Sequence, residues 1–331
     1  MSKLELSAAF SVNERTRALR EGSVVPEGIS WTTTGVHPSE MFWRQLKFEE
    51  FDVSEMSVSS LLISTSHGPT PWVALPVFTE RMFSHTMLHV RAAAGIEKPS
   101  QLAGKRVGVP EYQQTSAVWS RGILQHEFGV DLRSIDWFME RAPEMSHGGS
   151  TGFKPPEGIR LTYIKPDTDI GQMLMDGSLD ATLLYITDRN LVDRSRAEAG
   201  DRSGIKRLFP DVAAEGRRFY QKTNILPLNH CVVVRRSLYE RYPWIVLNIY
   251  NACVAAKEHA MQGALAVIEP HFTAGLLDPS ARAALRGDPF PYGIKGSLPT
   301  LEMLARILNE QGLTDRVVGL DEIFAKQTLD L

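Results

Sequence analysis

Cysteine is scarce in this sequence. Only Cys231 and Cys253 occur among 331 residues, and neither belongs to a CxxC motif or to a Cys/His spacing typical of zinc sites. Two cysteines are too few for a disulfide framework, so neither a disulfide-stabilised fold nor a zinc site is indicated. Cys253 lies among apolar neighbours of a helical segment, which favours an inert core thiol. We therefore expect reduced thiols and a cytoplasmic protein.

Long apolar runs and basic runs are also missing. No window approaches the roughly 18 apolar residues that a membrane span requires. The first residues, MSKLELSAAFSVNERTR, carry Glu5 inside a short apolar stretch and lack the pattern of a secretory signal. With 36 basic and 39 acidic side chains and no Lys/Arg cluster, the chain lacks the positive surface that nucleic-acid backbones need. We expect a small-molecule ligand and neither nucleic acid nor membrane as a partner, while the oligomeric state, a homo-oligomer included, stays open.

Motifs for metals and nucleotides are absent as well. The sequence has no HExxH, Walker or GxGxxG motif, and GKRVGVP does not replace one. What is present is ordinary globular composition, with 43% hydrophobic and 23% charged residues. At roughly 100 to 200 residues per domain, the length predicts two units with their own cores.

Short apolar or alternating runs recur between segments with helical periodicity. They lie at 4–10, 51–57, 72–78, 106–110, 159–164, 179–186 and 230–236. Strands that alternate with helices predict an α/β fold with mostly parallel sheets. Between them, the Gly- and Pro-containing stretch 142–158 predicts a surface loop. The stretch 243–261 has proline at its first position and apolar residues on most faces, and it predicts a long helix buried between other elements.

Three strand-to-helix junctions carry polar side chains. They cover residues 55–57, 111–116 and 185–189. In open α/β sheets, ligands gather at the carboxyl ends of strands, where helix N-termini offer free N–H groups to anions. The three junctions therefore predict one ligand cleft.

Two segments resemble the second lobe of type II periplasmic-binding-protein folds. They are LAGKRVGVPEYQQTSAVW at 102–119 and DIGQMLMDGSLDATLLY at 169–185. The resemblance implies two α/β lobes, each a mostly parallel sheet flanked by helices, with the ligand cleft between them. It places the crossings between the lobes near 84–91 and 229–235. Lobe 1 would then comprise residues 1–88 and 232–331, and lobe 2 residues 89–231.

A closer resemblance covers most of the chain. The segments ERTRAL at 14–19, FDVSEMSVSS at 51–60, PVFTERMFSH at 76–85, GKRVGVPEYQQTSAVWSRGILQHEFGV at 104–130 and NILPLNHCVVVRR at 224–236 are similar to 4,5-dihydroxyphthalate decarboxylases. This resemblance implies an aromatic-acid decarboxylase on a binding-protein scaffold, which converts 4,5-dihydroxyphthalate to protocatechuate and CO2. Because the scaffold also hosts transport and sensing, a solute-binding protein for an aromatic acid is the alternative.

Such a decarboxylation sets the chemistry of the site. When the ring carbon that bears the carboxylate gains a proton and the para hydroxyl loses one, CO2 can leave and the ring becomes aromatic again. The site then needs an acid at the ring carbon, a base at the phenol and cations for the carboxylate that stays. No organic cofactor is required, and a divalent metal held by histidine and glutamate is the alternative.

The candidate proton-transfer residues are two histidines and two glutamates. His85 and His230 lie near the expected crossings between the lobes, and an unperturbed imidazole titrates near pH 6.5. Glu55 and Glu111 stand at strand-to-helix junctions and are candidates for a base, for an acid if buried, or for a metal ligand. The alternatives are a hydrogen-bonded structural histidine and a glutamate that complements a helix dipole.

The candidate substrate-binding residues are arginines and side chains at helix starts. A guanidinium can grip a carboxylate through two parallel hydrogen bonds, so arginines near strand ends are clamp candidates, with a solvated surface arginine as the alternative. A tyrosine beside the cleft can stack on an aromatic ring or pack in the core. The candidates are Arg15, Arg17, Arg81 and, more weakly, Arg189, together with Ser57, Tyr112, Thr115 and Ser116.

Overall fold

Two β-sheets organise the chain in the computed structural model, which describes residues 3–196 and 204–331. The first sheet has the order β2-β1-β3-β11-β4 and the second the order β10-β5-β9-β6-β7-β8. The strands of the first are β1 (Leu4–Phe10), β2 (Ile29–Gly35), β3 (Val53–Ser57), β4 (Trp72–Arg81) and β11 (Leu228–Arg235). Those of the second are β5 (His89–Arg91), β6 (Arg106–Val109), β7 (Asp136–Met139), β8 (Arg160–Tyr163), β9 (Ala181–Thr182) and β10 (Ile205–Arg207).

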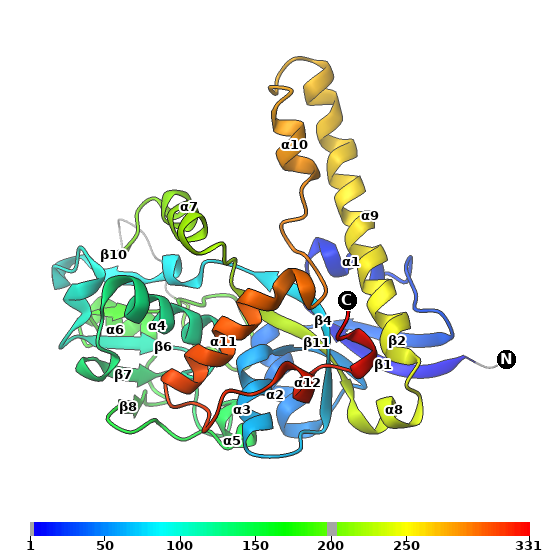
Figure 1. Cartoon of the computed structure of the whole chain (residues 1–331). Coiled ribbons are helices and arrows are strands. Elements are labelled where there is room, and N and C mark those ends of the chain that lie inside the picture. The colour runs from blue at the N-terminus through cyan, green and yellow to red at the C-terminus, as the bar shows by residue number, and fades with distance from the viewer. Residues whose placement is uncertain (1–2, 197–203) are drawn as a thin grey trace.

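Helices flank both sheets, and the two sheets lie in separate lobes (Figure 1). The α-helices are α1 (Glu14–Arg20), α2 (Pro38–Phe48), α3 (Val58–Ser66), α4 (Thr115–Phe128), α5 (Gly148–Thr151), α6 (Ile170–Asp176), α7 (Val212–Thr223), α8 (Arg236–Arg241), α9 (Ile245–Thr273), α10 (Ala281–Arg286), α11 (Leu298–Glu310) and α12 (Leu320–Ile323). Short 3-10 turns such as η1 (Ser84–Met87) complete the chain. The prediction of a two-lobed α/β fold is confirmed.

Of the nine strand pairs in the described residues, five are parallel and four are antiparallel. In the first sheet β1 runs parallel to β2 and β3, and in the second β6 runs parallel to β7 and β9. The antiparallel strands are those next to the crossings, because β11 returns to pair with β3 and β4, and β5 pairs with β9 and β10. The carboxyl ends of β3 and β6 therefore open toward one region between the lobes.

In the sequence, the strands of the first sheet come partly before and partly after the strands of the second sheet. Its strands come from residues 4–81 and 228–235, and those of the second come from residues 89–207. The predicted limits at 88 and 231 stay a prediction, and β11 spans the second of them. One buried cluster runs through both lobes, since Met56 and Trp72 of the first belong to the same cluster as Val107 and Trp119 of the second. The indole N–H of Trp119 also donates to the carbonyl of Leu228 at 2.9 Å.

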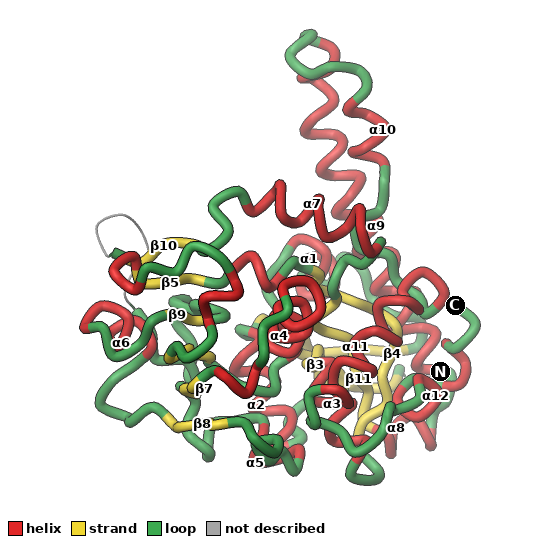
Figure 2. The backbone as a smooth tube through the Cα atoms, turned by 60° about the vertical axis from the view of Figure 1, so that its left-hand side comes forward, coloured by secondary structure: helices red, strands yellow, loops and turns green. Residues whose placement is uncertain are grey.

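The long helix α9 departs from the prediction. Its first half buries Ile245, Ile249, Cys253 and Ala256 against the first lobe. Its second half and α10 project away from both lobes (Figures 1 and 2). The predicted stretch 243–261 buries one face only, since Asn251 and Ala255 on the other face are exposed, so it is not buried between other elements. In the part of the chain that the structure describes, no helix combines the length and apolarity that crossing a membrane would require.

The stretch 142–158 also differs from the prediction of a surface loop. It contains the short helix α5, and Ser146, His147 and Thr151 within it are buried. His147 is buried because its ring packs edge-on against Phe42 of α2 and its Nδ1 lies 3.2 Å from the hydroxyl of Ser60 in α3. This part of the stretch therefore belongs to the contact between the lobes.

Candidate functional site

A pocket of about 260 Å³ lies between the two lobes. Its walls combine polar side chains from both lobes with a patch of apolar side chains. The polar residues are His37, Ser39, Ser57, Glu80, Asn229 and His230 from the first lobe and Gln114, Thr115, Ser116, Arg141, His147, Tyr185 and Asp188 from the second. The apolar residues are Pro38, Phe42, Met82, Met87, Leu184 and Ile186.

Three helices begin at this pocket. His37, Ser57 and Gln114, the residues that precede α2, α3 and α4, all line it. The hydroxyls of Ser57 and Thr115 lie 2.9 Å apart and join the starts of α3 and α4. Because the first N–H groups of a helix have no partner within the helix, three positive helix ends face one small space. This arrangement suits a ligand with more than one negative charge.

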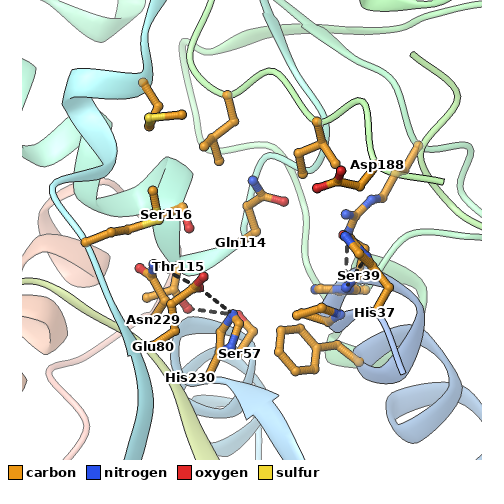
Figure 3. A pocket seen from close by; sticks show the side chains of 18 of the residues that line it. His37, Ser39, Ser57, Glu80, Gln114, Thr115, Ser116, Asp188, Asn229 and His230 are labelled. Atoms are coloured by element: carbon orange, nitrogen blue, oxygen red, sulfur yellow. Dashed lines mark hydrogen bonds and ion pairs between the residues drawn. The ribbon is translucent and has the colours of Figure 1, made fainter. Parts of the chain in front are cut away.

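Of the predicted binding residues, Ser57, Thr115 and Ser116 line this pocket. Ser57 precedes α3 as predicted, although its hydroxyl contacts Ser59 and Thr115 rather than capping the helix with its own hydrogen bond. Helix α4 starts after Gln114 and ends at Gly129. Gln114 lies between the walls in the close view of the pocket (Figure 3).

His230 is the titratable group with the most specific surroundings. It is buried on β11 and lines the pocket. Its Nε2 lies 3.1 Å from Oε2 of Glu80 and its Nδ1 lies 3.3 Å from Oε2 of Glu55 (Figure 3 shows the first pair). The ring hydrogen-bonds to Glu55 through Nδ1 and forms an ion pair with Glu80 through Nε2, and two carboxylates on either side favour the imidazolium form.

The electrostatic balance at His230 follows from these contacts. Burial by itself lowers the pKa of His230, but the carboxylates of Glu80 and Glu55 outweigh it and raise that pKa above 6.5. Burial acts against the charge of Glu55 too, yet the hydrogen bond from His230 and those from Ser11 and Thr79 lower the pKa of Glu55. His230 and Glu55 therefore form a pair in which a positively charged donor is hydrogen-bonded to a negatively charged acceptor.

Glu55 is fixed behind His230 rather than exposed to the pocket. Its Oε1 accepts from the backbone N–H and the hydroxyl of Ser11 at 2.8 and 2.6 Å, and its Oε2 accepts from the hydroxyl of Thr79 at 2.6 Å. The side chain is fully buried and does not line the pocket. Such a carboxylate can orient an imidazole and stabilise its charge.

A β-bulge helps to aim His230 at the pocket. The pairing of β11 with β4 shifts register on both sides of His230, which lies opposite Glu80, while Val232 lies opposite Leu75. Pro76, which has no N–H to give to the ladder, lies in the bulged part of β4. Bulges of this kind re-aim side chains beside active sites. Here the bulge brings Glu80, Asn229 and His230 to one wall.

A second buried charge pair stands behind the opposite part of the pocket. Arg141 donates through Nε and Nη2 to both carboxylate oxygens of Asp193, at 2.7 and 3.1 Å. The two side chains are 1% and 0% exposed, so neither charge is solvated by water. Burial acts against the charge of Asp193, but the adjacent guanidinium lowers its pKa.

His147 connects this pair to the first lobe. Nη1 of Arg141 lies 3.2 Å from Nε2 of His147, and because a guanidinium can only donate, that nitrogen is the acceptor. Nδ1 then carries the hydrogen and donates to the hydroxyl of Ser60 at 3.2 Å. Burial and the charge of Arg141 lower the pKa of His147 well below 6.5, so this histidine is neutral.

Glu111 lies below His147 and outside the pocket. Its carboxylate accepts from the hydroxyl of Ser146 at 3.1 Å and from the backbone N–H of His147 at 3.0 Å. Burial raises the pKa of Glu111. The structure thus gives this predicted catalytic residue contacts that support the His147 backbone rather than contacts with a ligand.

His85 does not lie at the pocket. It is fully buried in η1, its Nε2 is 2.9 Å from Oε1 of Glu215, and its ring contacts Phe209 and Phe219. Burial opposes the charge of Glu215, but hydrogen bonds from Arg218 and His85 lower the pKa of that carboxyl to about 2. The structure therefore places only one of the two candidate histidines, His230, at the pocket.

The four predicted arginines lie away from the pocket lining. Arg15 donates to the carbonyl of Thr79 at 2.7 Å and its guanidinium covers the ring of Phe290. Arg17 is exposed and pairs with Glu14, and Arg189 is exposed beside Asp188, which does line the pocket.

Arg81 is buried but is used within the first lobe. It donates to the carbonyls of Leu226 and Pro291 and to the hydroxyl of Ser297. Burial lowers the pKa of Arg81 to about 10. Tyr112 is likewise buried outside the pocket, where the guanidinium of Arg121 lies 3.8 Å from its ring centre.

Several residues of the pocket were not predicted from the sequence. Arg141 and His147 follow β7, and His37 follows β2, so each stands at the carboxyl end of a strand that the sequence pattern did not reveal. Asn229 and Glu80 are direct neighbours of predicted candidates. The motif His37-Pro38-Ser39 was a usable signal, because proline at the first helical position marks a helix start.

Metal ligands do not gather in the described residues. Among residues 3–196 and 204–331, no group of three or more histidine, cysteine, aspartate or glutamate side chains is arranged to hold a metal ion. The donors predicted for a metal are dispersed, since Glu111 and His85 lie away from the pocket that His230 lines.

Comparison with known proteins identifies the family. A 4,5-dihydroxyphthalate decarboxylase from Comamonas testosteroni is 30% identical over 337 residues, which cover 100% of this chain and 99% of that protein. The chain belongs to the 4,5-dihydroxyphthalate decarboxylase family. A protein of the same name from Pseudomonas putida is 34% identical over 183 residues, which cover 55% of this chain and 71% of that protein. No family model matches the sequence.

The fold of this family member also matches a solved structure. A Candida albicans gene product described as having the generic periplasmic-binding-protein fold superposes with a TM-score of 0.54 at 14% identity, covering 99% of this chain and 98% of the other. This likeness confirms the fold. The activity has to be argued from the pocket and the family.

Proposed function

We propose that this chain is a carboxy-lyase that converts 4,5-dihydroxyphthalate to protocatechuate and CO2 in the pocket between the lobes. The observation that carries the proposal is His230, a buried imidazolium held between two carboxylates on the pocket wall. Family membership supports the substrate, an aromatic ring with two carboxylates and two hydroxyls. The solute-binding alternative is less well supported, because both similar proteins are named as decarboxylases.

The substrate is a dianion, and the carboxylate that stays on the ring is assigned to the helix starts. Ser57, Thr115 and Ser116 bring hydroxyls and helix N-terminal N–H groups to the pocket. Arg141 uses three of its five N–H groups on Asp193 and His147, which leaves two for a ligand oxygen. This set holds the carboxylate that stays on the ring.

His230 is assigned as the acid. Its Nε2 gives its proton to the ring carbon that bears the departing carboxylate. Nδ1 keeps its hydrogen and continues to donate it to Glu55. The side chain of Glu80 is 41% exposed, so it can move aside for the ring and later return a solvent proton to Nε2. A positioned acid of this kind contributes about 10²- to 10⁴-fold to the rate.

The base for the para hydroxyl has to lie across the ring from the acid. Asp188 and His37 lie across the pocket from His230 in Figure 3, and both line the pocket. Asp188 is assigned to take the phenolic proton and to return it after CO2 has left. Burial raises the pKa of Tyr185 to about 12, so its hydroxyl stays protonated at the pocket wall.

The apolar wall suits the bond-breaking step. Met82, Met87 and Leu184 face the pocket and offer no hydrogen bond to a carboxylate. A carboxylate placed there loses its hydration and gains stability when it leaves as neutral CO2. The electron pair of the broken carbon–carbon bond returns to the ring, which regains aromaticity with the new proton in place.

We also propose that the reaction uses no cofactor and takes place in the cytoplasm. The route draws its protons from His230 and Asp188 and needs no redox step or electron sink. Both cysteines are unpaired and buried, which suits a reducing compartment. Cell fractionation tests the location.

Turnover is the first test of the proposed function. The purified protein is expected to release CO2 from 4,5-dihydroxyphthalate and to form protocatechuate in equal amount, with the same rate before and after dialysis against a chelator. Tight binding without CO2 release would reject the enzyme and favour a solute-binding protein. Activity that disappears with the chelator and returns with a divalent metal would reject the cofactor-free route alone.

The pH dependence tests the role of Glu55. Because the acid is the charged form of His230, activity is expected to fall as the pH rises through the raised pKa of that residue. Glu55→Gln removes one of the two charges that raise this pKa, so the alkaline fall in kcat is expected at lower pH than in the unmodified protein. Rate profiles from pH 5 to 10 measure the difference.

Glu111→Gln is the matched control for this experiment. Glu111 is a buried carboxylate without a contact to His230, so its replacement is expected to leave the position of the alkaline fall unchanged. An unchanged profile in Glu55→Gln, or equal shifts in both variants, would contradict the pairing of Glu55 with the acid.

A further inference from the structure

Beyond Lys257 the long helix leaves the body of the molecule. Its second half and the return through α10 form an arm, residues 258–287, which projects away from both lobes in both overall views (Figures 1 and 2). Salt bridges from Glu269 to Arg282 tie the two sides of the arm together. The arm contributes no residue to the lining of the decarboxylase pocket.

The arm is apolar for an exposed structure. Between Glu258 and Asp278 the only side chain with a full charge is that of Glu269. Val267 is 71% exposed and Leu276 is 73% exposed. An apolar groove of about 420 Å³ runs between the two sides of the arm, lined by Met261, Leu265, Ile268 and Leu285 among others. A continuous exposed surface of this kind marks an interaction site.

The charge pattern of the arm favours one kind of binding partner over the others. No lysine or arginine lies between Lys257 and Arg282, whereas helices that bind lipid surfaces carry basic residues on their polar faces. A dissimilar protein partner would be matched by charges, and the exposed face offers almost none. Depletion of charge together with exposed aliphatic side chains is typical of contacts between identical chains.

The arm carries both a groove and projecting apolar side chains. At 100° per residue, Ala260, Ala264 and Val267 share one face of α9, where small side chains allow a second helix to approach closely. The same arm carries a groove and projecting side chains such as Val267 and Leu276. Around a twofold axis, the groove of each copy can receive the projecting side chains of the other.

We propose that the arms of two copies of this chain pack against each other in an antiparallel pair. Sixteen helical residues beyond Lys257 span about 24 Å, and two helices side by side are about 20 Å wide. One face of the arm then offers about 500 Å² per copy, or about 1,000 Å² in the pair, which reaches the lower limit for a specific interface. The pairing buries the surface that the single chain leaves in water.

The test is sedimentation velocity of the full chain over a range of micromolar concentrations. The unmodified protein is expected to sediment at twice the chain mass of 36.9 kDa. Val267→Glu is expected to raise the dimer dissociation constant by about 100-fold, because the twofold axis places the buried charge in the contact twice. Gln262→Glu adds the same charge about 140° away around α9 and is expected to change the constant by less than about threefold.

Turnover and circular dichroism of each variant separate weakened pairing from unfolding, since the arm is remote from the pocket. Leu276→Glu, which lies in the turn after α9, is expected to weaken the dimer without touching the helix. A monomer at every concentration, a dimer that Val267→Glu leaves intact, or flotation of the unmodified chain with lipid vesicles that Val267→Glu abolishes would each overturn the proposal. None of these outcomes bears on whether the pocket decarboxylates its substrate.

Discussion

Replacing His230 by glutamine is expected to lower kcat by about 10²- to 10⁴-fold, the usual contribution of a positioned acid or base. Glutamine keeps the approximate size and can still donate a hydrogen bond to Glu55, but it has no proton to transfer to the ring. KM is expected to change little, because the helix starts at Ser57 and Thr115 hold the carboxylate that stays on the ring. Rates of CO2 release over a range of substrate concentrations measure both constants.

His85→Gln is the matched control. His85 is also buried and also bonded to a glutamate, but it lies outside the pocket. Its replacement is expected to leave kcat within a few-fold of the unmodified protein. If His230→Gln keeps near-normal turnover, or if the two variants lose turnover equally, the assignment of the acid is wrong.

Replacing Arg141 by methionine is expected to lower the free energy of unfolding by about 3 to 5 kcal/mol, because the buried charge of Asp193 loses its partner. The effect is large since both side chains are almost entirely shielded from water. Urea unfolding followed by fluorescence measures it. Substrate binding is expected to weaken in the same variant, because Arg141 lines the pocket.

Two further variants make this prediction specific. In Arg141→Met with Asp193→Asn the unpaired charge is gone, so most of the lost stability is expected to return. Arg316→Met breaks an exposed pair with Glu322 and is expected to leave the free energy of unfolding almost unchanged. A loss below about 1 kcal/mol in Arg141→Met would show that the buried charge of Asp193 does not depend on Arg141 as described.

The local sequence pattern was sufficient to predict those elements that are determined by their own residues. The run 4–10 became β1 with the same limits, because its short run of apolar and alternating residues defines it. The junction after β6 became the start of α4, and Gly129 ends that helix in the left-handed conformation at φ 64°. These two features, with Ser57 ahead of α3, place three predicted binding residues at the pocket.

The arginines show where local pattern failed. Position near a strand end made Arg15 and Arg81 candidates for a carboxylate clamp. Both guanidiniums instead donate to backbone carbonyls, those of Thr79 for Arg15 and of Leu226 and Pro291 for Arg81. The role of each arginine is decided by partners that lie up to 210 residues away in the sequence. A local periodicity cannot reveal such distant contacts.

Arg141 and His147 were missed for a related reason. His147 lies in the stretch 142–158, whose glycines and prolines are typical of a surface loop, and Arg141 directly precedes that stretch. Asp193, the partner of Arg141, lies 52 residues further along the chain. The choice between His85 and His230 also depended on tertiary structure, because the bulge opposite Glu80 turns one toward the pocket while phenylalanines enclose the other.

The central claim is that the aromatic dianion binds at the three helix starts with one carboxyl-bearing carbon at His230. A crystal structure of His230→Gln with bound 4,5-dihydroxyphthalate tests it most directly, because that variant should bind the substrate without consuming it. The account predicts the ring between the walls of the pocket, with one carboxylate at Ser57 and Thr115, the other against the apolar wall, and a hydroxyl beside Asp188. A ring bound outside this pocket, or one whose hydroxyls rather than a carboxyl-bearing carbon face residue 230, would contradict it.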